Sequence, residues 1–591
     1  MSFLGEAKRR KVFQVAAVYA VVAWLLVQII VAVEDPLNLP GWFDTAVIVL
    51  LAIGFPITLI MSWAFNLTPE GLIADKGELA GSSGGRRIEF ILIGLLVVAL
   101  GWIGYRELGP SGDTNAQRLP NSVAVLPFGN LSPDVDDEYF ALGMHQEIND
   151  QLRKLSGLTV ISRTTMMRFA DSPKSIREIA DELGVDAVME GSLRYADNNV
   201  QVSVQLIDPG TDTDLWSATY DADMHEVSNI FAAQRNIATN VAGALEARMS
   251  LEEQRRLGRT PTASGEAYEF YLEGLAAAGG ATGPDGSERA REAFIAAINE
   301  DASFALAWAK LSYALTIAPT WEPDRTVELQ DRAYATALRA LELEPDLPEA
   351  HIAMSFVSTV RGDWIRAAEE YRLSIELGAN PDEMPEWSVL ELSVGHIDQA
   401  RSTLAANQVV NPLNSTGLAF LLAANEALGD SAAMRAGYEQ GRTFEENWYF
   451  GESIMNVIRL GRRELEALVG DDGAIPSLHT RFGDYDSTAA AVDALRSWHA
   501  SDESNNHNSK FAIAAWAAFY GDNDLALDAA ADSSKDRVQN IWFLWLPVFD
   551  EVRQTDGFRR LVEERGLVAY WEMFGWPDFC SPTEGTEFEC S

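Results

Sequence analysis

Three long apolar runs occupy the first part of the chain. They cover residues 12–33, about 43–65 and 88–105, and each is close to the roughly 20 residues that a helix needs to cross a bilayer. A cleaved signal peptide would have a shorter apolar region, and a buried core hairpin does not need three such runs. The pattern therefore predicts a membrane region, residues 1–107, with three transmembrane helices.

The basic residues that flank these runs predict their orientation. Residues 8–11 are all Lys or Arg, and Lys76, Arg86 and Arg87 lie between the second and third runs, whereas the loop 34–42 contains neither residue type. Loops rich in Lys and Arg stay in the cytoplasm. We therefore expect a cytoplasmic N-terminus and, after three crossings, residues 106–591 outside the cytoplasm.

The spacing of apolar residues changes after a polar linker, residues 108–121. Residues 122–250 alternate short apolar runs, such as SVAVLPF, with segments of helical spacing, such as 137–155. Gly184 is suited to end a helix, and Asp197-Asn198-Asn199 is suited to join two strands in a hairpin. The pattern predicts a compact α/β domain.

A period of 33–34 residues appears within residues 263–540. The glycines that define it, and the residues that follow each of them after five positions, are Gly362 with Ala367, Gly395 with Ala400, and Gly429 with Met434. This spacing is typical of tetratricopeptide repeats. Small residues let the two helices of a repeat pack closely, and glycine allows the tight turn between them. Such repeats stack into a solenoid with a concave groove.

The tail, residues 541–591, breaks this period and is rich in Trp and Phe. An aromatic binding patch is one interpretation of these residues. The end of a repeat array has to be covered by a different surface, however. We therefore favour a C-terminal aromatic cap.

The only two cysteines of the chain, Cys580 and Cys590, lie in this tail with nine residues between them. A zinc knuckle needs a closer pair and further ligands, which are missing. Because the predicted topology places the tail outside the cytoplasm, where thiols oxidise, we expect a Cys580–Cys590 disulfide. Two free thiols are the alternative, since spacing alone does not fix the geometry of the two residues.

Several segments resemble a known family. "SVAVLPFGNLS", "EYFALGM", "LGVDAVMEGSLR" and "VQVSVQLIDPGTDTDLWSATYD" are similar to the TolB-like amino-terminal domain that precedes tetratricopeptide repeats in many bacterial membrane proteins, and "GWPDFC" is similar to the family's closing segment. The resemblance implies a multi-domain fold: an α-helical membrane region, a TolB-like α/β domain and an all-α tetratricopeptide solenoid. It also implies the bacterial inner membrane, with residues 106–591 in the periplasm.

Members of this family often carry an adenylyl cyclase domain or a winged-helix domain. Only about ten residues precede the first apolar run, so we expect neither module in this sequence. The net charge of −42, from 87 acidic and 45 basic residues, repels phosphate groups and argues against nucleic acid as a partner. No phosphate-binding loop, zinc-protease motif or nucleophile elbow is present. We expect no catalytic residue, metal or cofactor.

Two functions follow from these expectations. The favoured one is a non-enzymatic interaction or scaffold protein, anchored in the bilayer, that binds a protein or peptide in the concave groove. The candidate groove residues on the first helices of the repeats are Trp308, Lys310, His351 and Trp387, although Trp308 and His351 also fit packing positions. The alternative is an enzyme, or a signalling-related member of the cyclase-associated family that has lost its catalytic module.

Overall fold

The computed structural model describes most of the chain after residue 118. The described residues are 119–591 with gaps at 135–136, 171, 281–282, 381–384, 448–453, 455–486, 502–506, 536–538 and 584–587, together with Tyr19, Val22, Ala23, Leu51, Phe55, 65–68 and 71–74. The chain divides into two units, Met1–Ser111 and Gly112–Ser591, and each is considered by itself.

The described part of the first unit shows a contact between two of the predicted spans. The Tyr19 hydroxyl donates a hydrogen bond of 2.7 Å to the Leu51 carbonyl, and the rings of Tyr19 and Phe55 lie 5.5 Å apart. The second predicted span ends where strand β1 (Phe65–Thr68) begins, which pairs with β2 (Gly71–Ala74). Among the described helices, none has the length and apolar character to cross a bilayer. The three predicted spans lie almost wholly outside the described residues.

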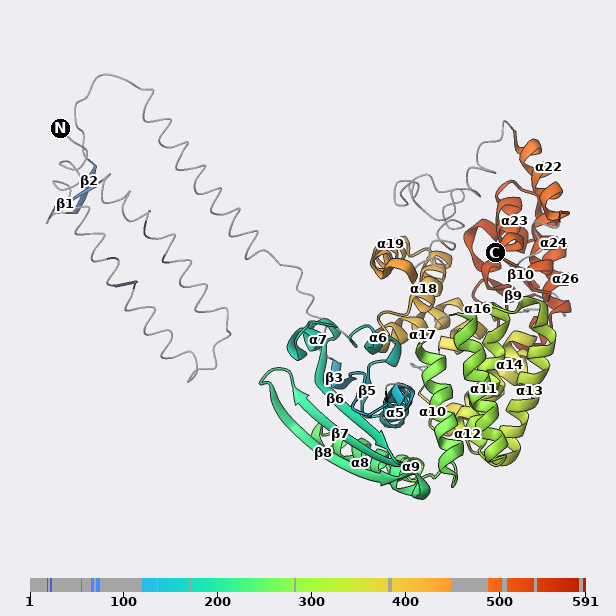
Figure 1. The fold of residues 1–591 in the computed structure, drawn as a ribbon. Helices are drawn as coiled ribbons and strands as arrows, with labels where there is room; N and C mark the ends of the chain where they lie inside the picture. The colour runs from blue at the N-terminus through green and yellow to red at the C-terminus, as the bar shows by residue number, and fades with distance from the viewer. Residues whose placement is uncertain are drawn as a thin grey trace. The chain divides into compact units, whose positions relative to one another are not determined.

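An α/β domain begins the second unit (Figure 1). Its elements are β3 (Leu119–Val125), β4 (Gly129–Asn130), α5 (Glu138–Arg153), β5 (Thr159–Val160), α6 (Arg163–Met167), α7 (Ile176–Leu183), β6 (Val185–Ala196), β7 (Asn199–Asp208), β8 (Thr213–Asp223), η2 (Met224–Glu226) and α8 (Ser228–Ala244). The sheet has the strand order β5-β3-β6-β7-β8, and β4 also pairs with β6. The pairings of β3 with β5 and of β6 with β3 and β4 are parallel, whereas β6, β7 and β8 form an antiparallel meander.

Helices cover the two faces of this sheet unequally. Apolar side chains such as Val123, Met189 and Val202 face α5 and α8 and form the main core. On the other face, Ala124 and Val188 pack against α6 and α7. These two helices contact β3 and β6, whereas their contacts with β7 and β8 are few among the described residues; Arg177 of α7 donates to the Gly210 carbonyl in the β7–β8 turn.

The local chemistry of the domain matches the sequence predictions. Gly184 ends α7 in the left-handed region, at φ 68°. Asp197 and Asn198 also have positive φ, at 49° and 60°, and join β6 to β7 in the predicted hairpin. The first strand starts earlier than predicted, because Leu119 already pairs with Val185. The end of the predicted linker is therefore part of the sheet.

The rest of the unit is mostly helical. Its elements are α9 (Leu251–Leu257), α10 (Gly265–Gly280), α11 (Pro284–Glu300), α12 (Ala305–Ile317), η3 (Ala318–Thr320), η4 (Pro323–Arg325), α13 (Thr326–Leu343), α14 (Pro348–Arg361), α15 (Trp364–Glu376), α16 (Pro385–Val394), α17 (Ile397–Val410), α18 (Ser415–Ala427), α19 (Ser431–Gly441), η6 (Arg442–Asn447), α22 (Thr488–His499), α23 (His507–Phe519), α24 (Asn523–Ser533), η9 (Trp542–Trp545), η10 (Pro547–Phe549), α25 (Asp550–Arg553), α26 (Asp556–Glu564), α27 (Leu567–Phe574), β9 (Cys580–Pro582) and β10 (Phe588–Cys590).

Consecutive helices pair as hairpins, from α10 with α11 to α18 with α19, and again α23 with α24. The predicted turn glycines Gly362, Gly395 and Gly429 all have left-handed φ values, between 78° and 86°. The side chains five positions later are fully buried, as in Ala367 and Ala400. The spacing of 33 and 34 residues thus corresponds to a repeated helix–turn–helix unit.

The aromatic tail packs on two separate parts of the helical region. It contacts α15 and α16 on one side and α23 and α24 on the other. The Asp578 amide donates to the Gly395 carbonyl at 3.0 Å, in the turn between α16 and α17, and the Trp364 indole donates to the Arg565 carbonyl at 2.7 Å. Besides the late helices that a terminal cap would cover, the tail therefore bridges back to an earlier hairpin.

Candidate functional site

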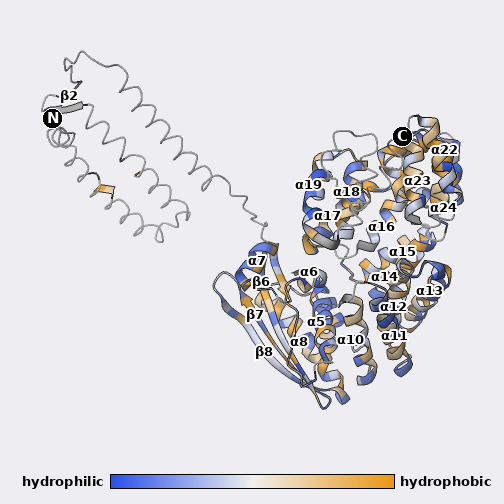
Figure 2. Cartoon of the chain, turned by 45° about the horizontal axis from the view of Figure 1, so that its top comes forward, coloured by the Kyte–Doolittle hydropathy of each residue, from blue (hydrophilic) through white to orange (hydrophobic). Residues whose placement is uncertain are grey.

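The outward face of the β6–β8 meander carries two rows of polar side chains. The strand register places Glu190 beside Gln205 and Gln205 beside Ser217. The next row runs Ser192, Ser203 and Thr219. Figure 2 shows hydrophilic and hydrophobic residues interleaved along β7 and β8, as expected when one face is packed and the other is open.

A cleft of about 650 Å³ lies against these rows. Its opposite wall is apolar and comes from Leu126, which follows β3, and from Phe169, Ile176 and Ile179 of the α6–α7 segment. The cleft thus adjoins the carboxyl end of the parallel strand β3. In open α/β sheets ligands bind outside the carboxyl ends of such strands.

Some polar groups of this cleft are already engaged in hydrogen bonds or ion pairs, and others are not. Ser203 and Thr219 share a hydroxyl–hydroxyl hydrogen bond of 3.1 Å, and Lys174 is paired with Glu182. The carboxylate of Glu190 and the hydroxyl of Ser192 lie in the cleft without a hydrogen bond to any described residue. The cleft therefore offers an unpaired carboxylate and a free hydroxyl group beside an apolar wall.

A second surface is closed within the molecule, because the α/β domain docks onto the helical region. Helix α5 crosses α10 so closely at Gly143 that a Cβ atom there would lie 2.5 Å from the Leu272 carbonyl oxygen. The Ser162 amide donates to the carbonyl of Val410 at 2.7 Å, near the end of α17. The domain therefore contacts helical hairpins that are far apart in the sequence.

Ion pairs reinforce this seam. Lys154 lies 3.4 Å from Glu349 of α14, and Lys310 of α12 lies 3.4 Å from Asp150 of α5. Burial by itself would raise the pKa of both carboxyls, but Lys310 lowers the pKa of Asp150 and Lys154 lowers that of Glu349. Both carboxylates are consequently charged, and the pairs are electrostatic links between the two regions.

The four predicted groove residues occupy different surroundings. Lys310 is part of the seam with α5. Trp308 is half-buried and donates to the Ala302 carbonyl at 3.1 Å, and Trp387 stacks on Tyr371 with ring centroids 3.6 Å apart. No hydrogen bond or ring contact in the described part of the chain joins one of the four to another.

His351, the fourth of these residues, is buried on α14. Its ring nitrogens lie 2.7 Å from the Pro345 carbonyl and 2.7 Å from the Glu370 carboxylate. Burial lowers its pKa, but these hydrogen bonds, above all the one to Glu370, outweigh it and raise the pKa. The His351 side chain thus fills a packing position, which the repeat pattern allows as the alternative to a position in the groove.

Among the described residues, no group of three or more His, Cys, Asp or Glu side chains is arranged to hold a metal ion. His145 is buried on α5 and bonds to the Val125 carbonyl at 2.9 Å. Burial lowers the pKa of His145 to about 4, so the ring is neutral and ties α5 to β3.

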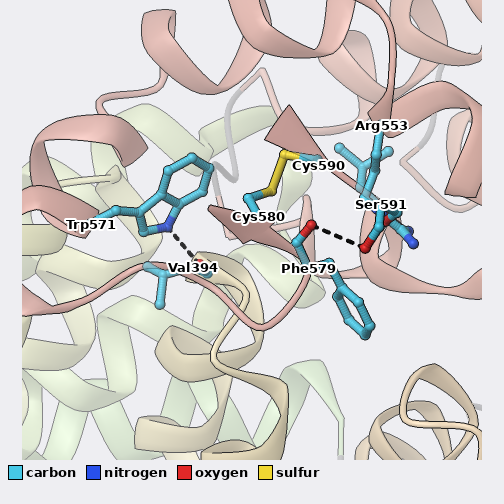
Figure 3. Close-up of a disulfide and its surroundings, with 8 residues drawn as sticks. Val394, Arg553, Trp571, Phe579, Cys580, Cys590 and Ser591 are labelled. Atoms are coloured by element: carbon cyan, nitrogen blue, oxygen red, sulfur yellow. Dashed lines mark hydrogen bonds between the residues drawn. A yellow bond between two sulfur atoms is a disulfide. The ribbon is translucent and has the colours of Figure 1, made fainter. Parts of the chain in front are cut away.

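The predicted disulfide is present, and it links β9 to β10 (Figure 3). The Ser591 amide donates to the Phe579 carbonyl at 2.8 Å, and Arg553 donates to the Ser591 carbonyl at 2.8 Å. The nearby Trp571 indole donates to the Val394 carbonyl of α16 at 2.7 Å. The bridge therefore fixes the end of the tail against the aromatic core that holds it to α16.

Comparison with known proteins adds two findings. Residues 119–240 match the family model described as the HilA/YgeH-like transcriptional regulator, second domain. The chain is also 30% identical over 250 residues to "Putative adenylate cyclase 3" of Rhizobium meliloti (strain 1021). The matched region covers 42% of this chain and 41% of that protein. The chain thus matches less than half the length of this relative.

The family match coincides with the α/β domain, which includes the polar rows and the cleft. The domain is therefore of a kind found in HilA/YgeH-like regulators. The open face was not among the predicted sites, although the alternation in VQVSVQLID places Gln201, Ser203 and Gln205 on one side of the strand and is a sequence signal for it.

Proposed function

We propose that this chain is a non-enzymatic interaction protein of the bacterial inner membrane, whose periplasmic part binds a protein partner. The open polar face of β6–β8 with its adjoining cleft is the observation that carries the proposal. Much of this face is not covered by a helix, and its Glu190 carboxylate and Ser192 hydroxyl have no hydrogen bond to a described residue, so the face is available to a ligand. The partner contacts this face, whereas part of the repeat surface is already used by the α/β domain.

In this proposal the α/β domain is TolB-like and the helical region is a tetratricopeptide-type solenoid. The hairpins, the left-handed turn glycines and the buried residues five positions later support the second assignment. The α/β domain packs against α10, α12 and α14, the first helices of their hairpins, and covers part of their surface. The remaining groove, including Trp387, stays a candidate surface for an extended segment.

The proposed topology is tested by reporter fusions. Alkaline phosphatase fused after Gln117 should be active and after Leu79 inactive, since this enzyme needs an oxidising compartment to form its disulfides. The basic residues before the first span and between the second and third spans support this orientation, and so does the Cys580–Cys590 bridge. The reverse activity pattern would refute a periplasmic location.

The binding function is tested by photo-cross-linking in intact cells. A photo-reactive amino acid at Ser217, on the open face, should give a discrete adduct with a partner protein. The same amino acid at Arg289, exposed on α11, should give none. Adducts of equal yield at both positions would show random collision and would contradict a binding role for the face.

A second candidate is a part in nucleotide signalling, and the similarity to the putative adenylate cyclase favours it. That similarity covers less than half of the relative, and the printed activity is that protein's own. Nucleotide turnover by the purified chain that is lost on substitution of a single carboxylate would establish this candidate. Capture at Ser217 without turnover supports the interaction function.

A further inference from the structure

Strand β8 forms one edge of the central sheet. It is 11 residues long, which corresponds to about 37 Å at about 3.4 Å per residue. Within the described part of the chain it pairs with β7 alone, and in Figure 1 it is the outermost strand of the sheet. At an edge, every second residue points its amide and carbonyl away from the sheet. Such an edge is a template for another strand.

Strand β8 has only some of the usual protections of an edge. Edge strands are protected by being short, by charged side chains (above all lysine), by proline and by bulges. The sequence TDLWSATYDAD contains no Lys, Arg or Pro, and the one irregularity in its register lies near its start, where Trp216 pairs with Leu206 and Asp214 with Ile207. The stretch from Trp216 to Asp223 is regular and free to pair.

The charges of β8 select the kind of strand that it accepts. All its charged residues are acidic, namely Asp214, Asp221 and Asp223. Two copies of β8 lying side by side would bring these carboxylates together, and like charges opposite each other destabilise a strand pair. The edge is thus disfavoured for self-pairing and suited to a basic segment.

The two sides of β8 present different chemistry. On the open face, Asp221 accepts a hydrogen bond of 2.8 Å from Gln201 through Oδ1, and Asp214 accepts from Gln205 through Oδ1. The second oxygen of each carboxylate has no hydrogen bond to a described residue. On the other face, towards α8, Trp216 and Tyr220 are half-buried. An adjacent strand would meet carboxylates and hydroxyls on one face and aromatic rings on the other.

We propose that the free edge of β8 binds an extended segment of the partner protein in which basic residues alternate with apolar ones. Main-chain hydrogen bonds to β8 supply affinity, and the alternating side chains supply specificity. The basic side chains pair with Asp214 and Asp221, and the apolar side chains cover Trp216 and Tyr220. This inference rests on the proposed interaction function and names the chemistry of its partner.

The proposal is tested with a short fluorescent peptide in which lysine or threonine alternates with valine. The purified full-length chain should bind it, and the variant Asp214→Lys/Asp221→Lys should bind it at least about tenfold more weakly, because opposite charges are replaced by like charges. Asp493→Lys/Asp528→Lys makes the same change in net charge at exposed positions on α22 and α24 and should bind as the wild type does. Equal weakening in both variants would reveal non-specific attraction to the acidic chain and overturn the proposal.

Backbone pairing is tested separately from charge. Two peptides of the same sequence, N-methylated on alternate residues so that opposite edges are blocked, should differ: one should lose binding and the other keep it. Equal binding of both would overturn strand pairing. A partner captured at Ser217 would in that case leave the interaction function standing. Concentration-dependent dimerisation that the Asp214→Lys/Asp221→Lys variant changes, with no peptide binding, would make a second copy the occupant and would also overturn the proposal.

Discussion

Replacing Gly143 by alanine is expected to weaken the packing of the α/β domain against the helical region. The expected loss of free energy is about 1–3 kcal/mol, the usual cost of overpacking. The new Cβ atom would lie 2.5 Å from the Leu272 carbonyl oxygen and 2.8 Å from the Leu272 Cβ atom. A backbone carbonyl of α10 cannot rotate away as a flexible side chain can, so the two helices have to separate. Hydrogen exchange of the amides in α5 and α10 measures this loss directly.

The matched control is Gly243→Ala, which makes the same substitution in α8 of the same domain. Gly243 is exposed, and its added Cβ atom would meet nothing within 4 Å. Alanine there should be neutral or should stabilise the helix by up to about 1 kcal/mol, because it reduces the entropy of the unfolded chain. Equal protection from exchange in both variants would show that the α5–α10 crossing does not hold the two regions together.

Features of the chain that repeat or that depend on a few neighbouring residues could be predicted from the sequence. The helical hairpins follow from the spacing of Gly362, Gly395 and Gly429, since a left-handed turn in each unit favours a residue without a Cβ atom. The β6–β7 turn follows from Asp197 and Asn198, which tolerate positive φ. The disulfide followed from a topology argument, since nine residues between two cysteines permit a ring without requiring it.

The contacts between distant segments could not be predicted in this way. Lys154 and Glu349 pair although they lie far apart in the sequence, and no periodic pattern of residues marks either one as a partner of the other. For the same reason the repeat pattern predicts a groove position for Lys310 and gives no sign of Asp150, which the docked domain places 3.4 Å from it. The bond between Asp578 and Gly395 belongs to the same class. Such contacts depend on the complementarity of folded surfaces, which a single sequence does not display.

The candidate site falls between these two cases. Its polar rows come from the period of two in β7, which is visible in the sequence. Whether helices would cover that face could not be predicted from the period of two. In the structure, α6 and α7 pack mainly over β3 and β6 and leave most of β7 and β8 uncovered. The exposure of the face, and with it the edge of β8, is a property of how the helices are distributed over the sheet.

A buried carboxyl group on α16 leads to the prediction with the largest effect. Glu391 is fully buried, and neither of its carboxylate oxygens has a hydrogen-bond partner in the described structure. Burial raises its pKa to about 8, and the nearby polar groups of Thr403, Trp387 and Gln399 offset this only in part. These groups lie close without meeting hydrogen-bond geometry, so the dominant influence on Glu391 is loss of water.

The sign of the pH dependence follows from this raised pKa. Between the ordinary value of 4.5 and about 8, the folded protein keeps the proton on Glu391 whereas the unfolded chain releases it. The folded state therefore binds more protons, and the free energy of unfolding falls as pH rises, by up to about 1.4 kcal/mol for each pH unit. This contribution is fully favourable below the unfolded pKa and is lost as pH rises through the folded pKa.

Glu391→Gln should therefore remove a pH-dependent loss of stability that the wild type suffers. Glutamine has nearly the same shape and does not ionise, so the variant should gain on the wild type by several kcal/mol in total from about pH 5 to about pH 8. Urea unfolding at a series of pH values measures the difference, in which titrations common to both proteins, such as that of His351, cancel. Glu273→Gln, an exposed position on α10, should run parallel to the wild type over the same range. If the free energies of unfolding of the wild type and Glu391→Gln instead differed by the same amount at every pH, the Glu391 carboxyl would ionise in the folded protein as it does in water, and the prediction would be wrong.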